Sequence, residues 1–442
     1  MIIRQFVADA LGDASYLVVS GQDAAVVDPQ RDVRPYLAAA AESGATIRFV
    51  FETHVHNDYV SGGRELAALG AEVVAPAGAG LQFPHRPIAD GDEVRIGNGC
   101  LRAVAAPGHT YEHTAYLAID EDGGTRGAFT GGALLIAAAG RSDLLGPDHE
   151  EELTRLQWET GHRLAAMLTG DAEILPTHGA GSFCSTTGAG MERRAPLAVE
   201  QGRNPVLVSA SYEIFRALQL GTRAPIPGYY RHMAPLNREG PKVFGEPPRP
   251  PALTPAALEH LLHEGVPVVD VRPRAEFAAA HVPGTFSIEQ SDAMLAYVGW
   301  LVPFNARMAL VAPGVPAARE ATTDLFRIGY DTVAGAMAFE DWTGTVASVP
   351  VATIADARAA IARNATVLDV RYAHEQDQSP LAGALRRPID QLPTWIDAVP
   401  NEPVLVVCAS GQRASTVASM LDARGLPVTA LIDGGAADLI AS

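Results

Sequence analysis

The 442-residue sequence contains only three cysteines, Cys100, Cys184 and Cys408. Three widely spaced cysteines cannot build a disulfide framework, and they suit a reducing compartment. The sequence also lacks a run of about 18 apolar residues that could cross a membrane. Its start, MIIRQFVADALG, has neither the basic leader nor the cleavage site of a secretory signal. We therefore expect a cytoplasmic protein without a membrane partner, in which any important cysteine acts as a thiol.

Basic residues are scarce as well. The 33 Lys and Arg residues are outnumbered by 51 Asp and Glu residues, and the formal net charge is −18. This charge opposes binding of a polyanion through its phosphates, so nucleic acid is not an expected partner. Hydrophobic residues make up 48% of the chain and charged residues 19%, which is typical of a globular protein. The length predicts roughly three domains.

A proline-rich segment divides the chain. Over residues 232 to 254, HMAPLNREGPKVFGEPPRPPALT, prolines cluster and apolar periodicity disappears, which predicts a linker. Behind it the sequence repeats itself: VPVVDVRPRAEF (266 to 277) matches ATVLDVRYAHEQ (365 to 376), and MALV (308 to 311) matches VLVV (404 to 407). We predict two copies of one domain, over residues 255–349 and 350–442.

The two halves of the chain differ in their secondary-structure pattern. In each repeat, apolar β-rich runs alternate with helical patterns such as STVASMLDARG (415 to 425), which predicts small α/β domains with parallel sheets. Residues 1–231 instead place short strands such as SYLVV and AAVVDP before a helix-like SGGRELAALG and then return to strands. This first half is predicted to mix sheets and helices without being doubly wound.

Histidines stand where predicted strands of the first half end. IRFVFETHVHNDYVSGG places His54, His56 and Asp58 behind one strand, while AAPGHTYEHTAYL and ILPTHGAGS place His109 and His178 behind two others. Because neighbouring strand ends can direct such ligands at one spot, these five residues form a candidate metal site. Other histidines read as surface or hydrogen-bonded core residues: His85, His149, His162, His232, His260, His263 and His374.

The order THxHxD, PGHT, FTG and PTHGAG resembles the metallo-β-lactamase superfamily, which implies an αββα sandwich over residues 1–231. The stretches SGG, GRSDLLG and LNREGP are most similar to the persulfide dioxygenases, particularly those fused to rhodaneses. That resemblance implies one iron(II) ion and the oxidation by O₂ of a low-molecular-weight persulfide to sulfite and free thiol.

One ligand of that family is missing. The resemblance implies an iron held by two histidines and an aspartate, and the first two match His54 and His109, but the residue after FTG is Gly132. The register holds, because Arg141 of GRSD follows at the family's spacing. His56 could complete a three-histidine site suited to zinc(II) or weakened iron, water or a thiolate could fill the gap, or the site could be empty. We favour an occupied iron(II) site over zinc(II), and expect an aspartate restored at position 132 to increase oxygen consumption.

Other side chains near the expected pocket have two readings each. Arg141 could bind an anionic substrate or be a surface arginine, and Cys184 in GAGSFCS could carry persulfide sulfur or be a plain buried cysteine. Cys100 follows a strand pattern and is predicted to be a core residue. Tyr59 stands where a second metal would have a histidine, which disfavours a dinuclear hydrolase.

A second motif lies in the last repeat. NEPVLVVCASGQRASTVASML predicts a strand that ends at Val407, a loop from Cys408 to Arg413, and then a helix. Loop amides, including those of Ser410 and Gly411, and the helix N-terminus can stabilise an anionic sulfur on Cys408, and Arg413 adds positive charge. The loop resembles the active site of rhodaneses, as do DVR, HVPG and IDGG. This implies that Cys408 takes sulfane sulfur from a persulfide or thiosulfate and passes it to sulfite or a thiol.

The first repeat has Ala312 at the position of Cys408, so it is predicted to have no nucleophile and to serve packing, positioning or docking. The sequence as a whole predicts sulfane-sulfur metabolism, with a sulfurtransferase joined to a persulfide dioxygenase-like metal domain. Two alternatives stay open: a zinc-dependent thioester hydrolase of the glyoxalase type on His54, His56 and His109, and a non-enzymatic persulfide carrier or sensor. A homo-oligomer is compatible with each of them.

Overall fold

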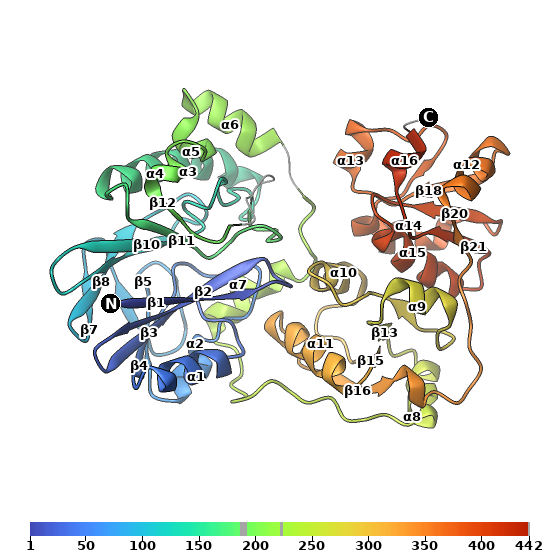
Figure 1. Ribbon diagram of the computed structural model, residues 1–442, viewed down its shortest axis with the longest axis horizontal. Coiled ribbons are helices and arrows are strands. Elements are labelled where there is room, and N and C mark those ends of the chain that lie inside the picture. Colours follow the sequence, from blue (N-terminus) through green and yellow to red (C-terminus); the bar gives the residue numbers. More distant parts are fainter. Residues whose placement is uncertain (186–191, 222–223, 441–442) are drawn as a thin grey trace. The chain divides into compact units, whose positions relative to one another are not determined.

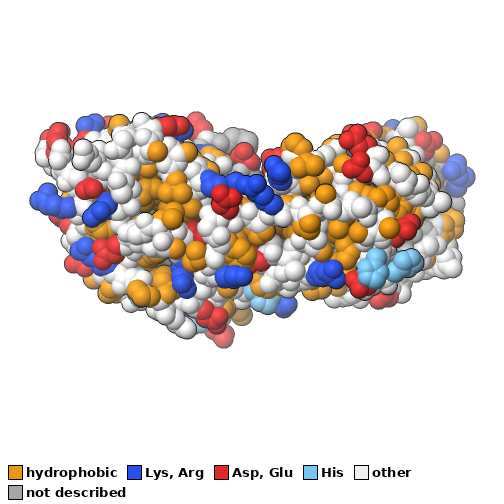
Figure 2. All heavy atoms as spheres, turned by 90° about the horizontal axis from the view of Figure 1, so that it is seen from below, with side chains coloured by type: hydrophobic (Ala, Val, Ile, Leu, Met, Phe, Trp, Pro, Cys, Tyr) orange, Lys and Arg blue, Asp and Glu red, His pale blue; other side chains and the backbone are white. Residues whose placement is uncertain are grey.

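The computed structural model describes residues 1–185, 192–221 and 224–440. The chain divides into two compact units, Met1–Pro247 and Pro248–Ser442, and each unit carries its own sheets (Figure 1). Among these residues, no helix is long and apolar enough to cross a membrane. On the face drawn in Figure 2, acidic and basic side chains are interspersed among apolar ones, so the negative charge is not gathered into one area of that face.

The first unit is built around two six-stranded sheets. The first sheet contains, in order, β1 (Ile2–Ala8), β2 (Asp13–Ser20), β3 (Asp23–Val27), β4 (Thr46–Phe51), β5 (Glu72–Pro76) and β6 (Arg86–Ile88). The second sheet contains β7 (Glu93–Ile96), β8 (Gly99–Ala105), β9 (Thr114–Ile119), β10 (Thr125–Gly131), β11 (Glu173–Pro176) and β12 (Ala195–Pro196). Tyr16 and Phe51 of the first sheet share one core with Tyr116 and Phe129 of the second. The sheets are therefore packed face to face.

Helices cover the outer face of each sheet in the first unit (Figure 1). On the first sheet they are α1 (Arg34–Glu42) and α2 (Gly63–Ala68), whose Tyr36 and Leu66 pack against Leu17. On the second they are α3 (Pro147–Met167), α4 (Leu197–Glu200), α5 (Pro205–Val208) and α6 (Tyr212–Gly221). This is the αββα sandwich expected from the sequence.

The predicted linker is partly helical. Helix α7 (Tyr230–Glu239) runs into the segment 232–254 and includes Pro235. It belongs to the first unit, because Met233 is buried and Asn237 donates to the backbone carbonyls of His56 and Tyr59 at 3.0 and 2.8 Å. Within the predicted linker, residues 240–254 contain no helix or strand. The clustered prolines therefore overstated the length of the linker at its N-terminal side.

The second unit contains two parallel sheets, one of four strands and one of five. The first has the order β14-β13-β15-β16 and consists of β13 (Val268–Asp270), β14 (Phe286–Ser287), β15 (Met308–Ala312) and β16 (Val333–Ala338). The second has the order β17-β21-β20-β18-β19 and consists of β17 (Val351–Ala352), β18 (Thr366–Asp369), β19 (Leu385–Arg386), β20 (Val404–Val407) and β21 (Val428–Leu431). The α/β pattern with parallel sheets is confirmed.

Helices flank both of these sheets. Those before residue 350 are α8 (Pro255–His263), α9 (Arg274–Ala279), α10 (Met294–Leu301) and α11 (Val315–Arg327). Those after it are α12 (Ile354–Ala362), α13 (Ala373–Gln378), α14 (Leu392–Trp395), α15 (Gln412–Asp422) and α16 (Ala436–Ile440). The repeated DVR segments make matching contacts, since Arg272 binds Asp270 and Arg371 binds Asp369, each pair at 2.7 Å. The sequence repeat is thus also a repeat of local structure.

The two halves of the second unit share a hydrophobic core. Phe277, Ala278 and Val349 belong to the same buried cluster as Cys408 and Val417. Polar contacts add to this packing: the Ser287 amide donates to Ser419 Oγ at 2.8 Å. The first repeat is therefore joined to the second by buried surface as well as by the chain.

Candidate metal centre and cysteine loop

Three histidines meet between the sheets of the first unit. His54 follows β4, His109 lies between β8 and β9, and His178 follows β11. All three are buried, and one ring nitrogen of each lies within 4.8 Å of the others. The two sheets thus bring together side chains that are separated by more than a hundred residues in the sequence.

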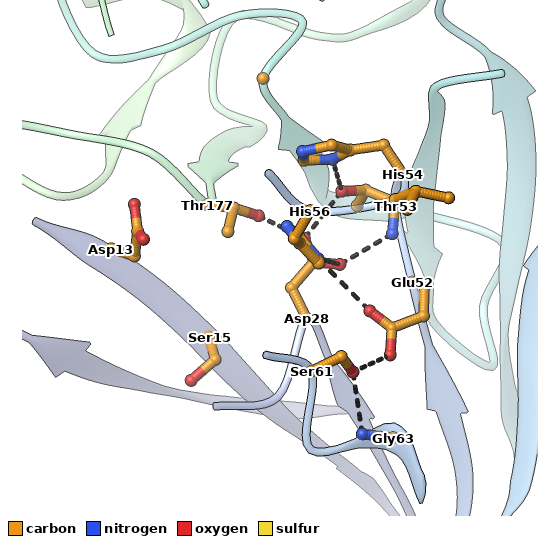
Figure 3. Close-up of polar contacts among 12 residues, drawn as sticks. Asp13, Ser15, Asp28, Glu52, Thr53, His54, His56, Ser61, Gly63 and Thr177 are labelled. Carbon is orange, nitrogen blue, oxygen red and sulfur yellow. Dashed lines mark hydrogen bonds and ion pairs between the residues drawn. The ribbon is translucent and has the colours of Figure 1, made fainter. Parts of the chain in front are cut away.

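The hydrogen bonds of His54 and His109 define which ring nitrogen is available. His109 Nδ1 lies 2.7 Å from the carbonyl oxygen of Arg141, which can only accept, so Nδ1 carries the proton. His54 Nδ1 lies 2.8 Å from Thr53 Oγ1, whose own proton goes to Asp28 (Figure 3). Both rings therefore present an unprotonated Nε2. The Nε2 of His109 has no partner among the described residues.

His178 follows β11 of the second sheet and faces His54, which follows β4 of the first sheet. Its Nε2 is 3.3 Å from Nε2 of His54, while its Nδ1 is 3.0 Å from Asp13 Oδ1 and 3.1 Å from Asp58 Oδ2. The carboxylates hold a proton on Nδ1. Two nitrogen lone pairs at 3.3 Å would repel each other, so a cation, either a proton or a metal ion, must lie between them.

The electrostatics of the three rings differ. Burial and the nearby His178 lower the pKa of His109 to about 3, and burial with the charge of His56 holds the pKa of His54 well below its usual range. Burial alone would lower the pKa of His178 too, but Asp58 and Asp13 raise it to about 10. His54 and His109 are thus neutral imidazoles, and His178 could exchange a proton for a metal ion. Three such imidazoles are suitable ligands for a divalent metal.

His54, His109 and His178 fit a divalent cation held by imidazoles, without the carboxylate that the family has at position 132. Position 132 carries no side chain, and a Cβ atom built on Gly132 would lie 2.4 Å from Cδ2 of His109. The ring of His109 thus fills the space where the family's aspartate side chain would begin. The imidazoles of His54, His109 and His178 are the ligand set that the structure offers beside position 132.

His56 belongs mainly to a different set of contacts. Its Nε2 lies 3.2 Å from Asp28 Oδ1, 3.3 Å from Glu52 Oε2 and 3.0 Å from the Tyr59 hydroxyl, as Figure 3 shows for the two acids. Burial opposes protonation of His56, but Asp28 and Glu52 raise its pKa well above the usual range. The three-histidine set that the structure brings together therefore contains His178 in place of His56, and whether either residue binds a metal stays a prediction.

Two further potential ligand sets overlap the first. They are His56, Asp58 and His178, and Asp28, Glu52 and His56. All five predicted ligands, His54, His56, Asp58, His109 and His178, are buried, and the overlapping sets place them in one cluster. Their assignment to a metal stays a prediction.

Sequence reasoning missed His113 and Asp28. The Nε2 of His113 accepts the backbone N–H of Gly132 at 2.9 Å, and its ring is stacked on that of His54. Asp28 accepts from the Thr53 amide at 2.7 Å and from the hydroxyls of Thr53 and Thr177 (Figure 3), so it ties the segment before His54 to the segment before His178. The position of His113, four residues after His109, was the only local signal for it.

Arg141 and Cys184 lie deeper than expected. The Arg141 guanidinium binds Asp143 at 2.6 Å and donates to the carbonyls of Ala224 and Phe183. It is committed to protein acceptors, which corrects its predicted role as an anion-binding residue. Cys184 is fully buried, 3.9 Å from the Tyr230 hydroxyl, and burial and the nearby Asp58 raise the pKa of its thiol well above the usual range. It rests as a thiol.

The predicted cysteine loop joins β20 to α15. Cys408 is buried directly behind Val407, and the Gly411 amide donates to Cys408 Sγ at 3.0 Å. Gly411 has φ +92°, and a Cβ atom there would lie 1.9 Å from the Ile432 carbonyl oxygen, so only glycine closes this loop. Ser410 is exposed on the rim. The Gly411 backbone N–H, at the start of an 11-residue helix, therefore points at the sulfur atom.

Arg413 is held beside this loop by an ion pair. Its Nη2 is 2.9 Å from Glu375 Oε1, and its guanidinium lies over the Tyr372 ring at 4.5 Å. Burial opposes the charge of Glu375, but the hydrogen bond from Arg413 lowers the pKa of this carboxyl. The pair is therefore ionised on both sides at neutral pH.

The first repeat carries Ala312 at the end of β15, where the second carries a cysteine after β20. It nevertheless contacts the cysteine loop, because Gln412 Nε2 donates to Ser291 Oγ at 2.6 Å.

Comparison with known proteins matches both halves of the chain. Residues 9–190 match the Metallo-beta-lactamase superfamily and residues 353–441 match the Rhodanese-like domain. The human mitochondrial persulfide dioxygenase ETHE1 is 29% identical over 192 residues, which are 42% of this chain and 72% of that protein. A hydroxyacylglutathione hydrolase from Rhodospirillum rubrum is 38% identical over 120 residues, 26% of this chain. The chain spans only 45% of the length of that hydrolase.

A solved structure is similar over a larger part of the chain. The crystal structure of a metallo-beta-lactamase from Staphylococcus aureus subsp. aureus COL has a TM-score of 0.68 and 25% sequence identity, and the match covers 76% of this chain and 98% of that chain. A metallo-β-lactamase domain and a rhodanese-like domain are thus fused in this protein, with persulfide dioxygenase and hydroxyacylglutathione hydrolase relatives of the first.

Proposed function

We propose that this fusion of a metallo-β-lactamase domain and a rhodanese-like domain acts in sulfane-sulfur metabolism, with sulfur transfer at Cys408 as its central reaction. The hydrogen bond from the Gly411 amide to Cys408 Sγ, 3.0 Å long, carries this proposal. It places the sulfur against a backbone donor at the start of α15. Such a site favours an anionic sulfur, either the thiolate or the persulfide.

The transfer step needs no external oxidant. The Cys408 thiolate attacks the outer sulfur of a persulfide R–S–SH, the S–S bond of the donor breaks, and the electron pair leaves with the thiolate R–S⁻. Cys408 then carries the persulfide Cys–S–SH, which passes its outer sulfur to sulfite or to another thiol in the same way. Loop amides hold the anionic sulfur at each stage.

For the first domain we propose one divalent cation held by His54, His109 and His178. Iron(II) there would supply oxygen activation and zinc(II) would supply water activation. The chain's own contribution is to fix the rings: the Arg141 carbonyl holds Nδ1–H of His109, and Asp13 and Asp58 hold Nδ1–H of His178. We propose iron(II), because the persulfide dioxygenase relative and the rhodanese-like domain both belong to sulfur chemistry.

The domain limits follow the same proposal. We assign residues 1–239, which include the whole of α7, to the metal domain, 255–349 to a rhodanese-like repeat without a nucleophile and 350–442 to the repeat with Cys408. The matching Asp270–Arg272 and Asp369–Arg371 contacts support the assignment of the middle domain. The substrates are then a low-molecular-weight persulfide, thiosulfate or sulfite, and the reducing cytoplasm is the proposed location.

Intact-protein mass spectrometry tests the central reaction. After exposure to a low-molecular-weight persulfide, the native protein is expected to gain one sulfur atom, and Cys408→Ala is expected to gain none. Cys100→Ala is the matched control, because Cys100 lies in the other unit on β8. Full sulfur uptake by the Cys408 variant would contradict the proposal.

A zinc-dependent thioester hydrolase is the second candidate for the first domain. The donor set of three histidines without a carboxylate suits zinc, and a hydroxyacylglutathione hydrolase is among the relatives. Metal analysis of the purified protein separates the candidates when it is combined with two assays. Iron with oxygen uptake supports persulfide oxidation, whereas zinc with thioester cleavage and no oxygen uptake supports the hydrolase.

A further inference from the structure

Two arginines lie next to the Cys408 loop, and each is paired with a glutamate. In the second repeat, Arg413 Nη2 lies 2.9 Å from Glu375 Oε1. In the first repeat, Arg274 Nη1 lies 2.8 Å from Glu289 Oε1. The side chains of both pairs are at least two thirds buried, with exposed fractions of 9% and 25% for the first pair and 30% and 16% for the second.

Arg274 reaches the loop through one backbone carbonyl. Its Nε donates to the Ile432 carbonyl oxygen at 3.1 Å. That same carbonyl packs against the Cα of Gly411, where an added Cβ would lie 1.9 Å from it. The first repeat thus supplies a cation within a few ångströms of the sulfur cradle, and Ser291 of the same repeat holds Gln412.

The two glutamates cancel the charge of the two arginines. Residues 409–412 of the loop, Ala-Ser-Gly-Gln, carry no charge of their own. The attraction for an anion at Sγ therefore comes from backbone N–H groups and from the helix N-terminus, which is equivalent to about half a positive charge. This potential offsets part of a single negative charge on the sulfur. It is too small to balance a thiolate together with a doubly charged donor.

Resting on the proposed function, we infer that Cys408 takes sulfane sulfur from persulfides of low charge and discriminates against the dianion thiosulfate, with Glu375 as a residue that determines this specificity. Loading from thiosulfate has the same bond changes as loading from a persulfide. The Cys408 thiolate attacks the outer sulfur, the S–S bond breaks, and sulfite leaves with the electron pair. The difference is that thiosulfate brings two negative charges to the cradle, more than a persulfide with an uncharged organic part.

The test measures the rate at which the full-length protein gains one sulfur atom, followed by intact-protein mass spectrometry. The donors are thiosulfate and the persulfide of 2-mercaptoethanol, whose organic part carries no charge. The native protein is expected to load from the persulfide at least about 100-fold faster than from thiosulfate. Glu375→Gln frees the charge of Arg413 and is expected to increase the thiosulfate rate about tenfold, while the persulfide rate changes less than about threefold.

Two further variants guard the interpretation. The glutamine at position 375 can still accept the Tyr372 amide, which Glu375 accepts at 2.9 Å, so the start of α13 keeps its cap. Glu289→Gln changes the other pair without touching α13 and is expected to increase the thiosulfate rate in the same direction. Glu402→Gln is the matched control, because Glu402 is exposed and bonded to Thr366, and it is expected to change neither rate.

Each outcome decides the matter. Equal loading rates from the two donors in the native protein would overturn the inference. So would variants Glu375→Gln and Glu289→Gln that change the thiosulfate rate and the persulfide rate by the same factor. Failure of the native protein to load from either donor would instead refute sulfur transfer at Cys408 itself. A selective gain with thiosulfate supports both.

Discussion

The imidazole of His109 occupies the space that a side chain at position 132 would need. A Cβ atom built on Gly132 would lie 2.4 Å from Cδ2 of His109. Gly132 also donates its backbone N–H to Nε2 of His113. The glycine at position 132 and the position of the His109 ring therefore depend on each other, because the ring lies where an aspartate side chain would begin.

Restoring the acid in this background is expected to do harm. Gly132→Asp must displace the His109 ring, and we expect a loss of about 1–3 kcal/mol in the free energy of unfolding, as for other overpacked cores, together with weaker metal binding. This revises the expectation from sequence that the substitution increases oxygen consumption. Denaturant unfolding and metal analysis are the measurements, with Gly202→Asp at an exposed turn as the control. Unchanged stability with a gain in oxygen uptake would refute it.

Removal of any one of the three facing histidines is expected to reduce metal binding. Replacing His54, His109 or His178 by alanine should lower metal affinity at least about tenfold, because each removes a direct ligand. Metal content per chain, measured after dialysis against a fixed free-metal concentration, checks this. His162→Ala is the control, because His162 packs on Trp158 outside the cluster. Equal metal content in all four variants would show that the metal lies elsewhere.

His56→Ala should act on stability more than on metal binding. Its ring lies between Asp28 and Glu52, and without it two buried carboxylates face each other. Removing one partner of a buried ion pair costs about 3–5 kcal/mol. The free energy of unfolding should fall by this order in metal-free protein. If metal binding is lost while stability is unchanged, His56 is a ligand and the assignment to His178 is wrong.

The loop glycine offers a sharp comparison. Gly411 and Gly425 have similar backbone angles, with φ of +92° and +75°, but only at Gly411 would a Cβ meet the protein. Both Gly→Ala changes place a side chain in the left-handed region, which costs about 1 kcal/mol. Gly411→Ala is expected to cost more in denaturant unfolding and to abolish sulfur uptake at Cys408, whereas Gly425→Ala should retain it. Equal effects would mean that loop closure does not matter.

The Glu375–Arg413 pair predicts a pH dependence of stability. The folded protein lowers the pKa of Glu375 below its ordinary value of 4.5, so the pair stabilises the fold above that value and the contribution is lost as the pH falls through the folded pKa. Because the glutamate is partly exposed, the effect should not exceed about 1 kcal/mol. The difference in unfolding free energy between native protein and Glu375→Gln should shrink between about pH 6 and pH 3. If this difference in unfolding free energy grows on acidification, the ionised Glu375–Arg413 pair does not stabilise the fold.

Local signals predicted the parts of both sites that depend on neighbouring residues in the sequence. Strand, loop and helix around Cys408 follow one another directly, so the donor from Gly411 could be anticipated from the glycine and the helix start alone. In the same way, His54 and His109 could be placed at strand ends.

What the sequence could not give is the choice among side chains brought together from both sheets. His56 lies two residues from His54, which favoured it as a ligand, yet it turns to Asp28 and Glu52, which come from two other points in the chain. For Arg141 the sequence left open an anion-binding role and a surface position, whereas its acceptors at Asp143, Phe183 and Ala224 become neighbours only on folding. The packing of Phe277 with the core of the last repeat was equally invisible.

That shared packing has a consequence for how this protein can change. Phe277, Ala278 and Val349 complete the apolar interior that also contains Cys408. A fragment starting at residue 350 would therefore expose apolar surface to water and aggregate. Deletion, exchange or duplication of one half alone would break the other. We therefore expect the two repeats to fold only when both are present in one chain.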